Sequence, residues 1–277
     1  MKGWDALREE RYARMVEMGL IDEKWALSPL HEDVPAWDKL SKEAQADWDL
    51  RMAVYAAMID RMDWNIGRVI EKLEAQNKLD NTLILFLSDN GGCAEHVTNA
   101  STGVAAGPLN SYEAVQLLWA NAQNTPFRKF KRYDHEGGIS TPLIAHWPKT
   151  IHAGTMTDAP GHIIDIMATV LELGKATYPT EMKGDNVEPL EGKSLVPVLK
   201  GGTREGHEAI YWQFGGSDAM RAGDWKIVRD GNEHWELYNL VEDRTELNNL
   251  AKAEPERVMQ MGKMWTTWAT RCGAIVR

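Results

Sequence analysis

The segment 83–92, Leu-Ile-Leu-Phe-Leu-Ser-Asp-Asn-Gly-Gly, constrains the fold of this chain more than any other stretch. Its apolar part runs without polar alternation, which is typical of a strand buried on both faces of a parallel sheet. The strand stops at Asp89 and Asn90, and open α/β sheets bind ligands where their strands end. Carboxylate and amide oxygens at that point suit a hard cation such as calcium or magnesium. Residues 89–92 are equally typical of an Asx-turn, so both interpretations stay open.

The pattern along the rest of the chain indicates an α/β protein with a different texture at its C-terminal end. Helices are expected at 5–19 with Asp5 as N-cap, at 41–77 and at 163–173 with Gly174 just beyond its end, and strands at 82–87 and 142–147. In the long helix, apolar side chains from Trp48 to Leu73 are spaced by four and three, which predicts a stripe packed into a core. His146, inside the second strand, is expected to be a core histidine.

After about residue 178 the chain becomes rich in proline, glycine and charge, and then forms short strands. These are expected at 209–214, 219–221, 225–229 and 234–238, with a hairpin at Asp230-Gly231 and a closing helix from Pro255. We therefore expect two domains. Residues 1–206 form an α/β region with its connector, and residues 207–277 form a small antiparallel sheet that carries a helix.

Composition excludes several classes of function. The formal net charge is −10, from 31 basic and 41 acidic residues, which argues against a nucleic-acid partner because such a partner needs a broad basic surface. No run is long enough for a membrane span. The N-terminus has no apolar signal-peptide region, which fits either a cytoplasmic protein or a chain whose beginning lies further upstream.

Positive charge is concentrated in the loop that holds Arg128, Lys129, Lys131 and Arg132. Clustered cations usually form a solvated surface, but this cluster runs into a Glu-Gly-Gly sequence, where a ligand can approach the backbone closely. A cationic loop and a hard-metal corner are what an anionic ester requires. Composition does not indicate which of the four cations points inward. His135 is either a proton donor to a leaving group or a hydrogen-bonded structural histidine.

Several motifs, in the same order along the chain, resemble the type I sulfatases, the arylsulfatase family. They are residues 88–92, residues 124–128 with Lys131, residues 135–144, and, further on, residues 164–167, 190–195, 223–226, 235–240 and 243–247. The resemblance implies an alkaline-phosphatase-like mixed sheet with flanking helices, followed by a small C-terminal antiparallel sheet with a helix. It also implies a sulfuric ester hydrolase acting on a small-molecule sulfate ester.

The resemblance assigns roles to individual residues. Asp89 and Asn90 match two calcium ligands of the family. Lys131, five residues before Glu136, matches the lysine that contacts the sulfate and the leaving oxygen. Arg128, His135 and Glu136 are the candidates for residues that support that lysine from behind the site. The cofactors implied are Ca²⁺ and a formylglycine made from a cysteine.

The chain departs from the family pattern in one decisive respect. The family's nucleophile lies in a Cys-x-Pro/Ala-x-Arg motif, and neither Cys93 nor Cys272 has that context, so this chain carries no nucleophile. The paired aspartates that complete the calcium site are absent as well. We therefore interpret the chain as the C-terminal half of an arylsulfatase, inactive alone, with the missing N-terminal half as its partner. The alternatives are a related phosphodiester or phosphonate monoester hydrolase, or a non-catalytic remnant that acts as an interaction module.

Overall fold

The computed structural model describes residues 2–96 and 103–274, which fall into two compact units. The first unit contains residues 1–66, 90–141 and 211–277, and the second contains residues 67–89 and 142–210. The domain boundary predicted between residues 206 and 207 stays a prediction.

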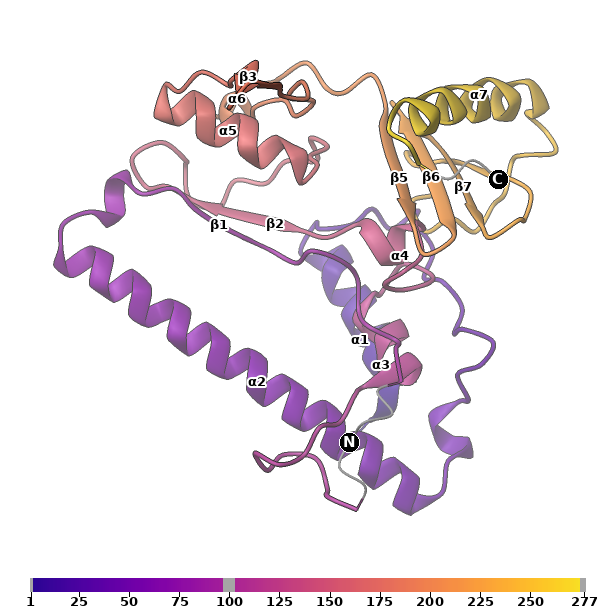
Figure 1. The fold of residues 1–277 in the computed structure, drawn as a ribbon. Coiled ribbons are helices and arrows are strands. Elements are labelled where there is room, and N and C mark those ends of the chain that lie inside the picture. Colours follow the sequence, from indigo (N-terminus) through magenta and orange to yellow (C-terminus); the bar gives the residue numbers. More distant parts are fainter. Residues whose placement is uncertain (1, 97–102, 275–277) are drawn as a thin grey trace. The chain divides into compact units, whose positions relative to one another are not determined.

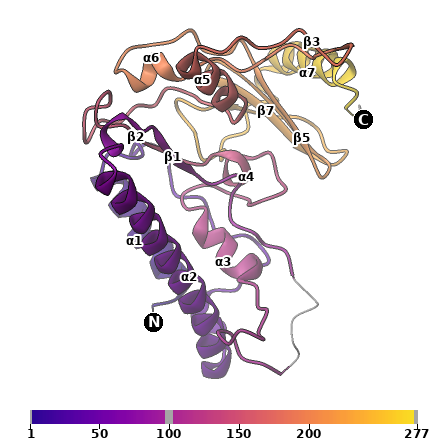
Figure 2. The same ribbon diagram turned by 60° about the vertical axis from the view of Figure 1, so that its left-hand side comes forward.

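A cluster of tryptophans holds together the helical part of the first unit. It is built from α1 (Gly3–Glu17), a 3₁₀ turn (Trp37–Lys39), the start of α2 (Lys42–Ala75) and α3 (Gln116–Gln123). Trp4 is fully buried and meets the rings of Trp37 and Trp119 edge-on, at centroid distances of 4.6 and 5.4 Å. As a result α1 and α3 lie side by side (Figures 1 and 2). Asp5 is not the N-cap of α1 but lies in its first turn, where its carboxylate accepts a hydrogen bond from the Trp37 amide.

The long helix α2 has nearly its predicted extent, but the prediction that its apolar stripe packs into a core is wrong. None of its residues is buried. Only Trp48 and Met52, near its start, pack against the tryptophan cluster. Further along, Met58 is 65% exposed and Val69 60% exposed. Tyr55, Ile59 and Met62 are exposed as well.

The C-terminal part of the first unit is a four-stranded antiparallel sheet that carries a helix, as predicted. Its strands are β5 (Ile210–Phe214), β6 (Ser217–Ala222), β7 (Trp225–Asp230) and β8 (Glu236–Asn239), in the order β5-β6-β7-β8. The helix α7 (Pro255–Arg271) packs against β6 and β7 and buries Met261 and Trp265 there (Figure 1). Gly231, with φ of 58°, begins the connection between β7 and β8, where the sequence predicted a turn.

The second unit contains a pair of strands that differs from the prediction. Its elements are a 3₁₀ turn (Leu79–Asn81), β1 (Ile84–Leu87), β2 (Leu143–His146), α5 (Ile164–Gly174), β3 (Glu181–Met182), β4 (Asp185–Asn186) and α6 (Val196–Leu199). β1 and β2 run antiparallel, with Phe86 opposite Ile144, and none of their residues is buried. The expectation of a strand buried in a parallel sheet was therefore wrong for the described chain. His146, expected in the core, is exposed.

The helix α5 buries its polar side. Asp165 is fully buried and accepts hydrogen bonds from the backbone of His162 and Lys193 and from the side chains of Arg204 and His207, at 2.7–2.9 Å. This cluster fastens the connector 193–207 to α5. The apolar residues of the same region, Ile163, Ile164, Met167 and Val170, are exposed instead. Gly174 is the last helical residue, and Lys175, one position later than predicted, adopts the left-handed conformation that ends the helix.

Candidate functional site

The turn that follows β1 is packed against the Glu-Gly-Gly motif. The motif forms the short helix α4 (Glu136–Ile139), and the amide of Gly91 donates a hydrogen bond to the Gly138 carbonyl at 2.9 Å. A Cβ atom on Gly91 would lie 1.8 Å from the Gly137 carbonyl oxygen. Only glycine therefore allows this contact. The amide of Gly92 is held by the Asn124 side chain at 2.7 Å.

The cationic loop is packed against the same two segments. The Lys131 amide donates to the Gly92 carbonyl at 3.0 Å. A Cβ on Gly137 would lie 2.1 Å from the Arg128 carbonyl oxygen, so glycine is required here as well. Lys129 and Arg132 have φ values of 64° and 86°, a conformation that costs energy for residues other than glycine. The structure thus brings Lys131 next to the turn after Asn90, on a strained backbone.

The side chains of the loop point to different partners. The Lys131 ammonium lies 3.3 Å from a carboxylate oxygen of Glu95 and remains about one-third exposed. The hydrogen bond from the Cys93 thiol, together with Lys131, lowers the pKa of Glu95. The Lys129 ammonium lies 4.6 Å from the centre of the Tyr133 ring. Arg128 turns towards the C-terminal sheet. Lys131 and Arg128 thus have different carboxylate partners, Glu95 and Glu236.

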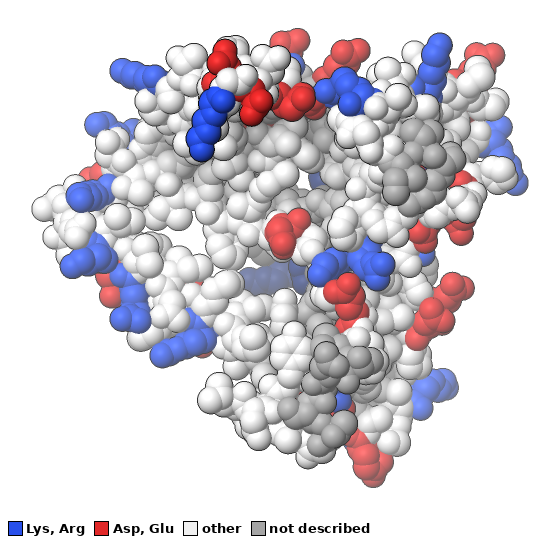
Figure 3. Space-filling model, in the orientation of Figure 1, with Lys and Arg blue, Asp and Glu red and all other residues white. Residues whose placement is uncertain are grey.

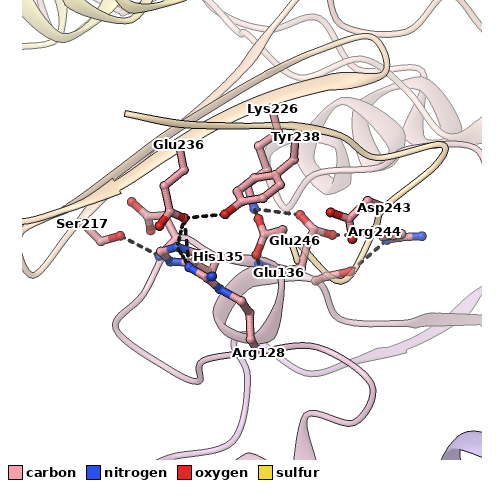
Figure 4. Close-up of polar contacts among 12 residues, drawn as sticks. Arg128, His135, Glu136, Ser217, Lys226, Glu236, Tyr238, Asp243, Arg244 and Glu246 are labelled. Atoms are coloured by element: carbon pink, nitrogen blue, oxygen red, sulfur yellow. Dashed lines mark hydrogen bonds and ion pairs between the residues drawn. The ribbon is translucent and has the colours of Figure 1, made fainter. Parts of the chain in front are cut away.

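Three side chains converge on a single oxygen of Glu236, a residue of β8. The Arg128 guanidinium lies 2.9 Å from Oε2, His135 Nε2 lies 3.0 Å from it, and the Tyr238 hydroxyl donates to it at 2.8 Å (Figure 4). Burial favours a raised pKa for Glu236, but the hydrogen bond from His135 and the charge of Arg128 outweigh it and lower the pKa to about 2. Burial raises the pKa of Tyr238, so its hydroxyl stays a donor. His135 is 2% exposed, which favours the structural interpretation of this histidine.

Glu136 belongs to a second buried cluster beside the first. Lys226 of β7 is fully buried, and its ammonium lies 2.8 Å from carboxylate oxygens of both Glu136 and Glu246. Glu246 also accepts the Glu136 amide at 2.9 Å, and Arg244 lies close to the other Glu136 oxygen (Figure 4). The charges of Lys226 and Arg244 lower the pKa of Glu136 despite its burial. Glu136 therefore acts as an anchor for α4.

These clusters contain polar residues for which no role was predicted. They are Lys226, Glu236, Tyr238, Arg244 and Glu246. All five lie in the C-terminal motifs that carry the family resemblance, so the sequence did contain a signal for them. Nothing in those motifs shows which loop they contact.

The described residues do not complete a calcium site. Asp89 is exposed and Asn90 half-buried at the end of β1. Calcium takes six to eight oxygen ligands. Among residues 2–96 and 103–274, no three His, Cys, Asp or Glu side chains are grouped so that they could hold a metal. Cys93 donates its thiol hydrogen to Glu95, and Cys272 is exposed. A calcium site that includes Asp89 and Asn90 therefore needs further ligands.

The surface does not show a broad basic region on the face drawn in Figure 3. Lysine and arginine side chains there are interspersed with aspartate and glutamate and with wide uncharged areas. No helix in the described part of the chain is long and apolar enough to cross a membrane.

Comparison with known proteins identifies the family. The fold is that of the alkaline-phosphatase-like hydrolases, in which a mixed α/β region is followed by a small antiparallel sheet. The profile of the sulfatase family matches residues 25–176, and that of the C-terminal region of N-sulphoglucosamine sulphohydrolase matches residues 127–267. The chain belongs to the sulfatase family.

Individual relatives agree with this assignment. The chain is 31% identical to an uncharacterised sulfatase of Schizosaccharomyces pombe over 295 residues, which covers 99% of this chain and 53% of that protein. It is 28% identical to an arylsulfatase of Klebsiella aerogenes over 211 residues, covering 71% of this chain and 45% of the relative. The chain thus spans about half the length of these two curated relatives.

Solved structures show the same fold. The crystal structure of Ps i-CgsB matches with a TM-score of 0.60 at 22% identity, over 96% of this chain and 54% of that one. A phosphonate monoester hydrolase of Agrobacterium radiobacter matches with a TM-score of 0.50 at 21% identity, over 80% of this chain and 41% of that one.

Proposed function

We propose that this chain contributes one side of the active site of a calcium- and formylglycine-dependent sulfuric ester hydrolase. Lys131 contacts the sulfate group and the leaving oxygen, and Asp89 and Asn90 are two of the calcium ligands. The nucleophile and the other ligands come from residues that this sequence does not contain. When bound, calcium would stabilise the sulfuryl oxygens.

The observation that supports this proposal most directly is the position of Lys131. The Lys131 amide donates a hydrogen bond to the carbonyl of Gly92, two residues after Asn90. This bond holds the backbone of the lysine close to that of the proposed metal ligand Asn90. An ammonium is a compact charge that suits a single sulfate oxygen. In this structure the exposed carboxylate of Glu95 contacts that ammonium, so the geometry already accommodates an anionic oxygen there.

The exposed apolar residues of the second unit support the proposal that another polypeptide binds to this chain and covers them. Two strands without further neighbours are only marginally stable, yet Phe86 and Ile144 form an apolar pair that is 43% and 60% exposed. The exposed apolar residues of α5 point to the same need. The partner we propose is a polypeptide with the remaining sulfatase sequence, because the matched S. pombe relative is almost twice as long as its aligned part. It would add strands to the β1–β2 pair and cover α5.

The test combines this chain with a sulfatase segment that contains the Cys-x-Pro/Ala-x-Arg motif, either fused or co-expressed. Hydrolysis of an aryl sulfate is measured with calcium and after its removal by a chelator. The expected result is calcium-dependent turnover that falls by about 100-fold or more in Lys131→Ala, since one charged contact to the reacting group is lost. Lys129→Ala is the matched control, because its ammonium lies over Tyr133. Unchanged turnover in Lys131→Ala would refute the sulfate contact.

A related phosphonate or phosphodiester hydrolase is the second candidate. The structural similarity to a phosphonate monoester hydrolase supports it, although similarity at this level of identity concerns the fold alone. Rates on an aryl sulfate and on a phenyl phosphonate ester, measured with the same assembled protein, distinguish the two. The third candidate, a non-catalytic interaction module, predicts a purified chain that is monomeric, unfolds cooperatively and binds no hydrophobic dye.

A further inference from the structure

Glu236 connects the C-terminal sheet with the loop that carries Lys131, and all of these residues belong to the first unit. One of its oxygens accepts from Tyr238, which lies two residues away in β8 and fixes the direction of the carboxylate. The same oxygen contacts Arg128, which lies in the loop, and His135, which directly precedes α4. In Figure 4 these two side chains point from the loop towards Glu236.

The two loop contacts lie on opposite sides of Lys131. Arg128 precedes it by three residues and His135 follows it by four. A single carboxylate oxygen therefore contacts both ends of the 128–135 loop, and these ends also contact each other, with the Arg128 guanidinium 2.9 Å from His135 Nε2. The loop requires such support because Lys129 and Arg132, on either side of Lys131, both have positive φ. Strained conformations of this kind persist only when the surrounding structure fixes them.

We propose that Glu236 is a positioning residue for Lys131. It touches neither the sulfate nor the reacting atoms. Through Arg128 and His135 it holds the loop in the strained conformation that presents the Lys131 ammonium. The inference rests on the proposed role of Lys131, and it gives the C-terminal sheet a part in building the active site. Small displacements of a positioned group reduce turnover strongly, so the contact matters although it is indirect.

The first experiment tests the structural half of the proposal on the full chain. The loop contains four trypsin sites, at Arg128, Lys129, Lys131 and Arg132. Cleavage there is measured by mass spectrometry relative to cleavage at Arg61 of α2. We expect this ratio to rise about tenfold or more in Glu236→Ala, and less in Glu236→Gln, because local opening exposes the loop. Glu256→Gln, an exposed carboxylate on α7, is the control and should match the wild type.

The ratio distinguishes positioning from a general loss of stability. If cleavage rises equally at Arg61 and in the loop, Glu236 merely stabilises the fold and the proposal is wrong. The proposal also fails if the loop stays as resistant as in the wild type. Glu236→Gln keeps the size of the side chain, so the comparison remains informative if Glu236→Ala does not fold.

The second experiment tests the functional half in the assembled enzyme, with Lys131→Ala, Glu236→Ala and the double variant. We expect Glu236→Ala to lower kcat/KM for an aryl sulfate about 10- to 100-fold when Lys131 is present, and to change little when Lys131 is already alanine. Additive losses would overturn the proposal. An assembled protein without sulfatase activity would refute the proposed function, while the trypsin experiment would still decide the role of Glu236 in the loop.

Discussion

His135 Nε2 lies 3.0 Å from Glu236 Oε2, although 101 residues separate the two positions in the sequence. The first residue directly precedes the Glu-Gly-Gly motif and the second lies in the C-terminal sheet. In the same sheet, Lys226 forms an ion pair with Glu136 of the motif. The C-terminal sheet is therefore bonded to the candidate site through two polar clusters, a partly buried one around Glu236 and a buried one around Lys226.

The first prediction concerns the Tyr238 hydroxyl. Tyr238→Phe removes one of the three contacts to this Glu236 oxygen with little change in the shape of the side chain. We expect a loss of about 1.5–3 kcal/mol in the free energy of unfolding, the typical effect of losing a hydrogen bond to a charged group. Chemical denaturation measures it. Tyr55→Phe, on the exposed part of α2, is the control, and an equal loss there would show that the effect is not due to Glu236.

The second prediction concerns the buried ammonium of Lys226. Lys226→Met leaves Glu136 and Glu246 buried without the cation between them, which should cost about 3–5 kcal/mol. The double variant Lys226→Met/Glu246→Gln removes one of the two charges and should recover part of that loss. Denaturant unfolding of both variants provides the test, with Lys263→Met on the exposed side of α7 as control. A double variant less stable than Lys226→Met would contradict this account.

The third prediction concerns the contact between α4 and the loop. In Gly137→Ala the new methyl group would lie 2.1 Å from the Arg128 carbonyl oxygen, which is backbone and moves only with the loop. We expect destabilisation by about 1–3 kcal/mol or more. The control is Gly67→Ala in α2, where a Cβ meets nothing within 4 Å, and a gain of about 0.5–1 kcal/mol is expected. Thermal melts that shift in opposite directions would confirm both expectations.

The elements with a strong local pattern could be predicted from the sequence. The helix 41–77 was expected almost where α2 is found, and the strands after residue 206 with the helix from Pro255 match the C-terminal sheet and α7. Periodicity indicates these elements because it depends on neighbouring residues. It does not show what covers them, which is why the apolar side of α2 was wrongly assigned to a core.

The partners of buried charges could not be predicted. Lys226 lies in a strand where a charged residue normally faces solvent, and only the folded structure shows that it is buried between Glu136 and Glu246. The antiparallel pairing of β1 with β2 was missed, because an apolar run without alternation favours a parallel sheet but does not show which strand lies beside it. In α5, the buried Asp165 reverses the usual amphipathic arrangement, since four hydrogen bonds compensate for its burial.

The fourth prediction concerns the pH dependence of stability. Asp134 is 3% exposed, and burial, reinforced by the nearby Asp218 carboxylate and opposed by Lys226, raises its pKa to about 8. The folded protein therefore keeps a proton that the unfolded chain releases near pH 4. Since the folded state binds the extra proton, stability should fall as pH rises between about 4 and 8, by up to about 1.4 kcal/mol per pH unit from this group.

Asp134→Asn provides the comparison, because the amide has a similar shape and does not titrate. Urea unfolding of both proteins between pH 4 and pH 9 gives the difference in the free energy of unfolding. We expect this difference to shift in favour of the variant as pH rises to about 8, and to stay constant above it, where the carboxyl is ionised in both states. Parallel curves over the whole range would mean that Asp134 is already ionised in the folded protein, and that the burial argument is wrong for this residue.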